Sequence, residues 1–446
     1  MNKKNVLVIP SHDASLVEYV RLFKRLNGEL NPIFYITYHS KKLVELLNTH
    51  WHVINDVSHP LNTTNKNSWV ANLLKYFFDN TTLGCYLQSD LLLSRLANKA
   101  KNRVLDNAEK LTSLMVAENI TDLVISSDRS SGIEAAACYA AKKLDVKIII
   151  PAFAYSATYE SSYKLRTMKI YHAKYSQVPQ NIKRCAIYGD KGFYRPFESL
   201  MLHELGIHPE NPWVLGGGVA DSVLLDSKRE KSRLASYGGV ETKYQVTGTA
   251  AQDEVLHCYN NKASIKKTLL NNANFSTDRP ILIISLPQYF EHKLMGKEQH
   301  IEIFKDLFEK LAVLNYSIFV SLHPKSDRDD YQWINECSPN IKIIDCSLTN
   351  IIAIADIFMG TYTSTMCWAL MCHVECVIVD HPNLNYQDFL SEFDIPVCKS
   401  NEEIIKFLTG PKQSRGCNFE SIEQLGEFDG KSSVRIFQAF NNSTLE

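Results

Sequence analysis

The sequence predicts an α/β protein made of two Rossmann-like domains that face a cleft. Short runs rich in β-branched residues alternate with longer amphipathic stretches, which is the pattern of βαβ units in a parallel sheet. A polar stretch rich in Asn and Lys, at about 257–278, interrupts this pattern, and a fresh series of strands begins at Pro280. We therefore expect an N-terminal domain over 1–255, a linker over 256–276, a C-terminal domain over 277–410 and a helical tail over 411–446.

In the first half, each expected strand is a short apolar run, and each expected helix repeats apolar residues at helical spacing. The expected strands cover 6–10, 32–37, 122–127, 146–153, 222–227 and 244–248. The expected helices lie around 16–23 and 43–47, over most of 62–120, and at 133–144, where the sequence is rich in Ala.

The second half repeats the alternation. Its expected strands cover 280–287, 316–324, 342–346, 356–360 and 375–380. Its expected helices cover 298–314, 348–355, a segment from about 364 and, in the tail, 432–440. Open parallel sheets bind ligands beyond the carboxyl ends of their strands, so the residues that follow each strand are the first candidates for a site.

The composition excludes two broad classes of protein. The 446 residues include 48 Lys and Arg against 49 Asp and Glu, which leaves a formal net charge of −1. A dedicated nucleic-acid binder would need a basic excess to neutralise phosphates, so we expect no nucleic-acid partner. Hydrophobic residues at 45% and charged residues at 22% are ordinary for globular proteins and exclude disorder of the whole chain.

The cysteines and the apolar runs bear on location and metals. The 11 cysteines are scattered and form no C-x-x-C pair, so we expect free thiols and no zinc site. No apolar run is long enough for a signal peptide or a membrane span. We therefore expect a cytoplasmic protein, with no metal and no cofactor, that could lie at the inner face of the membrane. Lys75–Phe78 could contact a bilayer, although an internal core face is the favoured interpretation.

Two candidate nucleotide-binding motifs follow strands of the second half. His323, Pro324 and Lys325 end a strongly apolar strand. The proline stiffens the turn, the imidazole can donate a hydrogen bond to a phosphate, and the lysine adds a positive charge. Gln288 begins a loop after the strand 280–287 and could flank a base or a sugar. A plain turn with a surface His and an ordinary surface loop are equally weighted alternatives.

A third candidate motif is Thr363, Ser364 and Thr365, where a helix is expected to begin after Gly360. Glycine permits a tight turn, and hydroxyls beside the unpaired N–H groups of a helix start can bind an anion. An ordinary Ser/Thr N-cap is the favoured interpretation of such a motif alone. Together with His323 in the neighbouring strand unit, the motif favours phosphate binding.

Candidate general bases follow the strands of the first half. Asp128 comes after the strand 122–127 and could be a base or a helix N-cap. His12 and Asp13, after the first strand, have the same two interpretations, and Asp190 is a further loop carboxylate. Gly216–Gly218 could bind a phosphate, but it lacks the spacing of a dinucleotide-binding or P-loop motif.

Together these motifs resemble those of the GT-B glycosyltransferases, and most of all the bacterial surface-polysaccharide enzymes, which include sialyltransferases, Kdo transferases and CDP-polyol transferases. The resemblance rests on Val246-Thr247-Gly248 with Asp253, on His323-Pro324, and on Ser364-Thr365. It implies that the His-Pro and Ser-Thr pairs hold the phosphate and ribose of a cytidine nucleotide. It further implies transfer of a sugar, with a CMP-activated acidic sugar such as sialic acid or Kdo expected first, to a saccharide or lipid-linked acceptor.

The chain also departs from these families. The sialyltransferase base motif, two acidic residues and a glycine, has its nearest match in Gly189-Asp190-Lys191-Gly192, so the base stays open between Asp128, which is preferred, Asp13 and Asp190. UDP-GlcNAc 2-epimerases share the fold and resemble the region 248–253. Their basic loop is replaced here by Ser285–His292, so an epimerase is the second hypothesis. A non-catalytic nucleotide-sugar-binding assembly subunit is the third.

Overall fold

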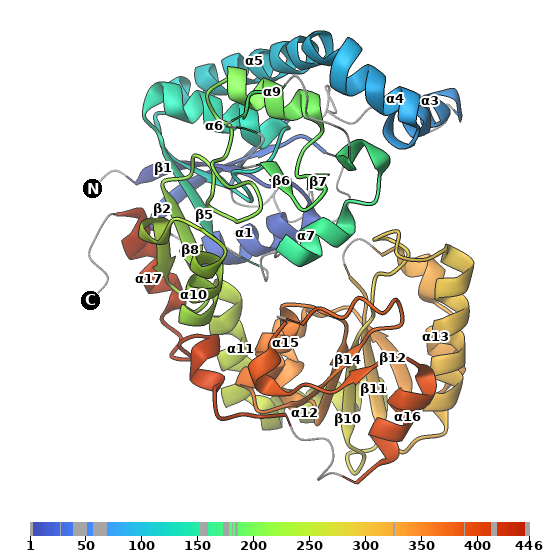
Figure 1. Cartoon of the computed structure of the whole chain (residues 1–446). Helices are drawn as coiled ribbons and strands as arrows, with labels where there is room; N and C mark the ends of the chain where they lie inside the picture. The colour runs from blue at the N-terminus through green and yellow to red at the C-terminus, as the bar shows by residue number, and fades with distance from the viewer. Residues whose placement is uncertain are drawn as a thin grey trace. The chain divides into compact units, whose positions relative to one another are not determined.

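The computed structural model of the chain describes residues 3–26, 28–38, 51–56, 69–151, 153, 159–172, 178–180, 182, 186–323, 326–387, 389–411 and 417–441. The chain divides into a first unit, Met1–Thr249 with Ser433–Glu446, and a second unit, Ala250–Ser432. Each unit contains an open sheet of parallel strands flanked by helices (Figure 1). The predicted α/β architecture with two Rossmann-like sheets is confirmed.

The sheet of the first unit has the strand order β3-β2-β1-β4-β5-β8-β9. Its strands are β1 (Lys4–Ile9), β2 (Leu30–Ile36), β3 (His52–Asn55), β4 (Ile120–Ile125), β5 (Lys147–Pro151), β8 (Ser222–Leu225) and β9 (Tyr244–Val246). A separate antiparallel hairpin joins β6 (Ile187–Tyr188) to β7 (Lys191–Gly192). The helices are α1 (Asp13–Arg25), α3 (Trp69–Asn80), α4 (Thr82–Tyr86), α5 (Leu93–Ala117), α6 (Ile133–Leu144), α7 (Tyr159–Leu165), α9 (Pro196–Glu204) and α10 (Lys228–Ser236).

The sheet of the second unit has the order β12-β11-β10-β13-β14-β15. Its strands are β10 (Ile281–Ser285), β11 (Ser317–Ser321), β12 (Ile341–Ile344), β13 (Ile357–Gly360), β14 (Glu375–Val379) and β15 (Val397–Cys398). Its helices are α11 (Ala250–Asn260), α12 (Lys262–Ala273), α13 (Lys297–Ala312), α14 (Ile334–Cys337), α15 (Thr365–Met371) and α16 (Asn401–Thr409). The last helix, α17 (Ser432–Phe440), begins at the boundary and belongs mostly to the first unit.

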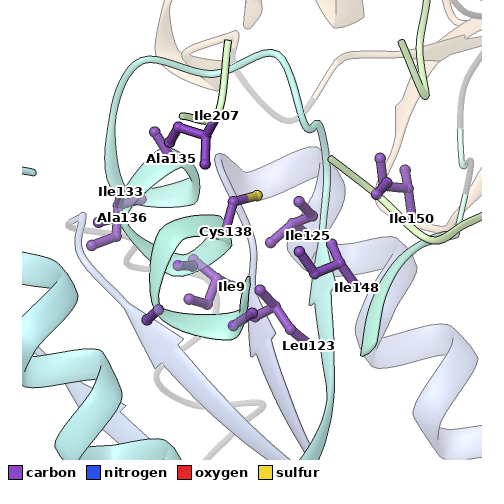
Figure 2. Packing of buried hydrophobic residues seen from close by; sticks show 14 of the residues in the cluster. Ile9, Leu123, Ile125, Ile133, Ala135, Ala136, Cys138, Ile148, Ile150 and Ile207 are labelled. Atoms are coloured by element: carbon purple, nitrogen blue, oxygen red, sulfur yellow. The ribbon is translucent and has the colours of Figure 1, made fainter. Parts of the chain in front are cut away.

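Alternation along the strands of the first unit divides its core into two layers. Ile9, Leu123 and Ile125 point to the face that α6 covers, where the helix presents Ala135, Ala136 and Cys138 (Figure 2). Small side chains let this helix approach the strands closely. On the other face, Phe23 of α1 packs edge-on against Phe34 of β2, with ring centroids 6.0 Å apart. Because side chains of helices pack on both faces of the sheet, the ends of the strands are the places where a ligand can approach it.

The observed units differ from the predicted domains at the linker and at the tail, whose last helix belongs to the first unit. Residues 256–276, predicted as a linker, carry the end of α11 and the whole of α12, which belong to the second unit. The predicted helix at 432–440 coincides with α17. The Lys4 and Lys147 ammonium groups each donate a hydrogen bond of 2.8 Å to a carbonyl oxygen at its end, those of Phe440 and Ala439, so this helix is fixed to the first unit.

Several smaller predictions are also settled or left outside the described ranges. The short strands β3, β6, β7 and β15 were not predicted because runs of two to four residues carry too little periodicity. The helix expected at 43–47 lies outside the described residues. Lys75 and Tyr76 are exposed, which contradicts an internal core face at 75–78, although Phe77 and Phe78 are half-buried. Within the described ranges no helix is long and apolar enough to cross a membrane, and every cysteine is a free thiol.

Candidate functional site

The carboxyl edge of the second sheet brings the predicted nucleotide-binding motifs together. Strands β11, β10 and β13 are consecutive neighbours, and Ser285 of β10 is level with Ser321 of β11. One residue earlier, Ile284 pairs with Met359 of β13, so all three strands end at the same height. The residues that follow them are Gln288, His323, and Thr363 to Thr365. The sequence separates these motifs by tens of residues, and the parallel register places them at one edge.

Gln288 lies in a loop that is tied to the next strand. The N–H of Leu286 donates to the carbonyl oxygen of Ser321 at 3.0 Å, which joins the loop after β10 to the end of β11. The side-chain oxygen of Gln288 lies 3.1 Å from Nε2 of His292. Its amide nitrogen is buried and has no hydrogen-bond partner among the described residues. A buried donor without an acceptor costs free energy, so a ligand oxygen that reached it would stabilise the loop.

His323 begins the turn after β11, and a buried network supports that turn. The carbonyl oxygen of His323 accepts the N–H of Ser326 at 2.9 Å. The Ser326 hydroxyl donates to Glu291 at 2.6 Å, and the Tyr331 hydroxyl donates to the same Glu291 oxygen at 3.3 Å. His300 Nε2 lies 2.8 Å from the Tyr331 oxygen. The network therefore fixes the backbone that presents the half-buried His323, while Pro324 and Lys325 lie outside the described residues.

Burial determines the protons of this network. Burial lowers the pKa of His300, and burial raises the pKa of the Tyr331 phenol. The lowered pKa favours the neutral imidazole, and the direction of the hydrogen bond between His300 Nε2 and the Tyr331 oxygen follows the ring's tautomer, while the Tyr331 hydroxyl donates to Glu291. Sequence reasoning missed Glu291, Tyr331 and His300, because only the fold brings them beneath the turn. The only available signal in the sequence was the position of Glu291, which lies in the same loop as Gln288.

The hydroxyl residues after β13 differ from the prediction in detail. The hydroxyl oxygens of Thr363 and Thr365 lie 3.1 Å apart, and Ser364 makes no side-chain cap. The N–H of Met366 donates to Thr363 O at 3.0 Å, and the N–H of Cys367 donates to Ser364 O at 3.1 Å. These two N–H groups already have acceptors, so the phosphate role predicted for 363–365 rests on the side-chain hydroxyls and stays a prediction. The half-buried hydroxyls of 363–365 remain available to a ligand.

The turn after Gly360 does not depend on a backbone conformation that only glycine favours. Gly360 ends β13 without a positive φ, and a Cβ built on it would meet its nearest heavy atom, Thr363 Cγ2, at 3.4 Å. The turn beyond it depends instead on Asp380, which is fully buried at the end of β14. Its carboxylate accepts the N–H groups of Leu384 and Asn385, at 2.8 and 2.9 Å, and the Tyr362 hydroxyl at 2.9 Å. Asp380 thus orients Tyr362 beside the hydroxyl residues.

In the first unit, the predicted base Asp128 has a structural role. Its carboxylate accepts the backbone N–H groups of Gly216, Gly218 and Ala220, at 3.2, 2.8 and 3.3 Å. Only 5% of the residue is exposed. A carboxylate that holds three N–H groups in the protein interior is neither free to take a proton nor open to an acceptor. This corrects the preference for Asp128, and it also assigns Gly216–Gly218 to loop anchoring rather than to phosphate.

The other predicted carboxylates behave differently. His12 is the N-cap of α1, with its Nδ1 accepting the N–H of Ser15 at 3.1 Å, so the capping interpretation holds for His12. One oxygen of Asp13, the next residue, is buried and has no hydrogen-bond partner among the described residues. Asp190 is exposed on the β6–β7 hairpin, where Tyr163 and His172 bind its two oxygens. Asp13 therefore has the freest carboxylate of the three candidate bases, Asp128, Asp13 and Asp190.

Sequence reasoning missed Glu134, which lies in the first turn of α6 beside the end of β4. The residue is 3% exposed, and its Oε1 accepts the N–H groups of Ser126 and Ser127 at 2.7 and 3.2 Å. Burial raises the pKa of Glu134 to about 7, against the lowering effect of these hydrogen bonds. An acidic residue at the start of an otherwise apolar, Ala-rich helix was the available signal.

Residues 232–357 match the model of a family described as alpha-2,8-polysialyltransferase (POLYST). This range begins within α10 and ends at the first residue of β13, so it contains Gln288 and His323. The hydroxyl residues 363–365 lie just beyond it. The match covers less than a third of the chain. Comparison with curated proteins yields no match.

Solved structures resemble the chain over almost its whole length. A UDP-GlcNAc 2-epimerase from Neisseria meningitidis bound to UDP-GlcNAc has a TM-score of 0.54 at 11% identity, covering 98% of this chain and 100% of its own. The wall teichoic acid polymerase TagF, soaked with CDPG, has a TM-score of 0.54 at 12% identity, with 98% and 88% covered. The S. aureus MnaA–UDP co-structure has 0.52 at 13% identity, with 99% and 98% covered. The chain has the GT-B fold. The resemblance to surface-polysaccharide glycosyltransferases is confirmed at this level by TagF and by the partial family match.

An Asp-x-Asp pattern in this GT-B chain is relevant to whether the chain binds a metal ion. The expectation of a metal-independent reaction overlooks an Asp-x-Asp pattern, Asp327-Arg328-Asp329, in the turn after β11. There the Asp327 carboxylate accepts the N–H of Asp329 at 3.2 Å and caps a short 3-10 turn. Within the described ranges, no three His, Cys, Asp or Glu side chains are arranged to hold a metal ion. Metal independence stays a prediction.

The edge of the second GT-B unit combines groups suited to an anionic ligand. An imidazole, three hydroxyls and an amide follow neighbouring strands. Asp380 is engaged in internal hydrogen bonds, and one oxygen of Glu291 accepts two hydroxyls while its other oxygen is buried without a partner among the described residues. Hydroxyl and amide donors can bind phosphate oxygens without the cost of burying unpaired cations. The edge can therefore hold a nucleotide phosphate and stabilise charge that develops on it.

Proposed function

We propose that the chain is a glycosyltransferase of surface-polysaccharide synthesis, which moves a sugar from a nucleotide donor to a saccharide or lipid-linked acceptor. The observation that carries the proposal is the convergence of Gln288, His323 and Thr363–Thr365 at one edge of the second sheet, through the register of β10, β11 and β13. The family match over 232–357 supports it, because that range includes the first two of these motifs.

The donor we propose is a CMP-activated acidic sugar of the sialic acid or Kdo type. The description of the matched family as a polysialyltransferase supports an acidic sugar. His323 and the hydroxyls of 363–365 would bind the donor phosphate, and Lys325 would add a positive charge there. Gln288 would contact the base or the sugar through its buried amide, which otherwise has no acceptor among the described residues.

In the transfer, the bond between the anomeric carbon of the donor and the phosphate oxygen breaks, and a bond from the acceptor oxygen to that carbon forms. Negative charge develops on the leaving phosphate, where the His323 N–H and the hydroxyls would donate hydrogen bonds that strengthen as the charge grows. The turn that carries His323 is held by Glu291 and Ser326, so these donors need little rearrangement during the reaction.

The acceptor hydroxyl must lose its proton, and for this step we propose Asp13 of the first unit. The three N–H groups on Asp128 argue against that residue, and Asp13 is supported by a carboxylate oxygen without a hydrogen-bond partner among the described residues. If the reaction inverts the anomeric carbon, Asp13 is the general base. If the reaction retains it, the same carboxylate is the nucleophile.

A thermal-shift panel of CMP, CDP, UDP and GDP tests the donor. A ligand that binds only the folded state stabilises it by about 2.7 kcal/mol at a hundred times its dissociation constant, so the preferred nucleotide raises the melting temperature most. We expect CMP to give the largest shift. A larger shift with UDP, together with consumption of UDP-GlcNAc without an acceptor, would instead favour an epimerase like the structural neighbours. Nucleotide binding without turnover on any donor and acceptor pair would indicate a non-catalytic binding subunit.

A further inference from the structure

Residues 69–91 expose an unusual amount of apolar side chain. Six residues of α3, α4 and the following π-helical turn (Leu87–Leu91) are each more than half exposed, and Tyr76 and Leu91 reach 64% and 67%. They form what we call the apolar surface: Leu73, Leu74, Tyr76, Leu83, Tyr86 and Leu91. A helix that is apolar on most sides normally lies in a protein core. Large exposed apolar patches on folded proteins mark surfaces that contact a partner or a membrane.

This segment is firmly anchored. The Asp79 carboxylate is 2% exposed and pairs with Arg195 at 2.7 Å. The Gln88 amide donates to the Phe78 carbonyl oxygen at 2.6 Å. A Cβ on Gly84 would lie 2.2 Å from the Phe77 carbonyl oxygen, so α4 packs against α3 as closely as the backbone permits. The apolar surface is therefore displayed by a fixed helical hairpin.

A line of positive charge continues from the apolar surface. Arg95, Lys99 and Arg103 recur every four residues on α5, beginning four residues after Leu91, and we call them the basic stripe. All three are exposed, on the side of the helix opposite Leu93 and its buried neighbours. In the described part of the chain, none of them forms an ion pair.

Between Lys75 and Arg103 no exposed acid interrupts this charge, and the first exposed acid that follows is Asp106 of α5. Between residues 69 and 105 the only acidic residues are Asp79, which is buried, and Asp90, which is half-buried and accepts the Ser89 hydroxyl at 2.6 Å. The exposed charges of this range are Lys75 and the basic stripe, and all are positive. In a symmetric dimer through this surface, a second copy would bring the same cations and no exposed carboxylate of residues 69–105 to meet them.

We propose that the apolar surface and the basic stripe dock on the face of an anionic lipid bilayer. Leucines would enter the boundary between headgroups and acyl chains, tyrosines would lie at headgroup level, and the cations would meet anionic headgroups. With 12 residues at 1.5 Å each, α3 is far shorter than the roughly 30 Å hydrocarbon core, so the segment lies on the bilayer. The proposal is independent of the glycosyl transfer, because docking needs no substrate.

Vesicle flotation with the full-length chain tests the docking. We expect binding to vesicles of 70% phosphatidylcholine and 30% phosphatidylglycerol, weak binding to pure phosphatidylcholine, and a loss of binding as salt is raised from about 0.1 to 0.5 M. The variant Arg95→Gln/Lys99→Gln/Arg103→Gln should weaken binding at least tenfold. Neutralising three exposed lysines elsewhere, Lys24→Gln/Lys142→Gln/Lys143→Gln, should leave it unchanged.

The apolar contribution has its own variants. Leu83→Gln/Leu91→Gln should weaken binding at least tenfold, whereas Val313→Gln, at a residue of the second unit that is 84% exposed, should not. Circular dichroism and thermal unfolding check that each variant folds. If the leucine variant does not fold, the docking is tested with the basic-stripe variant. Equal binding by all variants would overturn the proposal. So would a concentration-dependent dimer, seen by sedimentation, that Leu83→Gln/Leu91→Gln dissolves while no vesicle is bound.

Discussion

The carboxylate of Asp128 accepts the N–H of Gly218 at 2.8 Å, and this contact ties the loop after β4 to a glycine loop ninety positions later in the chain. The Gly216 and Ala220 N–H groups bind the same carboxylate. The aspartate is therefore the acceptor around which residues 216–220 fold. Its role is to order the edge of the first sheet.

Asp128→Asn should destabilise the chain by about 2–4 kcal/mol, because the new amide group places a donor against N–H donors in the interior. Urea unfolding measures this. Asp106→Asn, on the exposed side of α5, is the control and should change the free energy of unfolding by less than about 0.5 kcal/mol. An Asp128→Asn protein that unfolds like the wild type but has lost its transferase activity would restore the catalytic interpretation.

Gly218 should tolerate no side chain. A Cβ at this position would lie 2.5 Å from the carbonyl oxygen of Asp128 and 2.8 Å from Oδ2, so one of the two loops must move. We expect Gly218→Ala to cost about 2–3 kcal/mol of unfolding free energy, as overpacking does. Gly296→Ala is the matched control, since no heavy atom lies within 4 Å of its Cβ and its φ is −68°. Because Gly296 is the N-cap of α13, where alanine is less favourable than glycine, that control should cost less than about 1 kcal/mol. Equal effects from the two substitutions would contradict the interlocked loops.

Glu134 should make the stability of the chain fall as pH rises. Burial raises its pKa from 4.5 in the unfolded chain to about 7 in the folded one. Between these values the folded chain keeps a proton that the unfolded chain has released, so the stabilisation is complete below pH 4.5 and is lost as pH rises through 7. The shift corresponds to about 3 kcal/mol.

Glu134→Gln removes this dependence and keeps the oxygen that accepts the Ser126 and Ser127 N–H groups. The free energy of unfolding of the wild type should fall by about 3 kcal/mol relative to Glu134→Gln between pH 4 and pH 8, as measured by urea unfolding at each pH. Glu109→Gln, at an exposed position of α5, should leave the pH profile of the wild type unchanged. Parallel profiles for the wild type and Glu134→Gln would show that Glu134 ionises normally.

The sequence was sufficient to predict that Gln288 and His323 lie at one edge of the second sheet, because each residue follows a strand that the sequence marks clearly. Gln288 and His323 directly follow strands with strong apolar patterns, and parallel strands end at a common edge, so strand assignment alone places them together. The role of Asp128 could not be predicted in this way. An aspartate after a strand has the same local pattern whether it is a base, a cap or an anchor, and its partners at 216–220 are distant in sequence.

The same limit applies to Asp380 and Glu291. Each carries a hydrogen-bond network that holds a loop of the candidate site, and each looks in sequence like an ordinary loop acid. The contacts that define them come from elements brought together by the sheet: Tyr362 follows β13, while Tyr331 lies beyond β11. The start of the short α15 could not be predicted in detail, because its Met366 and Cys367 N–H groups bind carbonyl oxygens of the preceding turn.

His323 should be required for turnover and dispensable for folding. It is half-buried after the end of β11, and the backbone of its turn is held by the Ser326 N–H and, through the Ser326 hydroxyl, by Glu291. Loss of one donor to charge developing on a leaving phosphate typically costs about 10²–10³ in rate. We therefore expect His323→Ala to lower kcat for the CMP-sugar by that factor, with an unfolding free energy within about 0.5 kcal/mol of the wild type.

His257→Ala, at an exposed position of α11 in the same unit, is the control for His323→Ala and should retain full turnover. The kinetic pattern separates two roles of the imidazole. A lower kcat with little change in KM means that His323 acts on the transition state, whereas a raised KM alone means that it only binds the donor. In both cases the melting-temperature shift with CMP should be smaller in His323→Ala than in His257→Ala. A His323→Ala protein with undiminished turnover and an undiminished CMP shift would exclude this edge as the donor site.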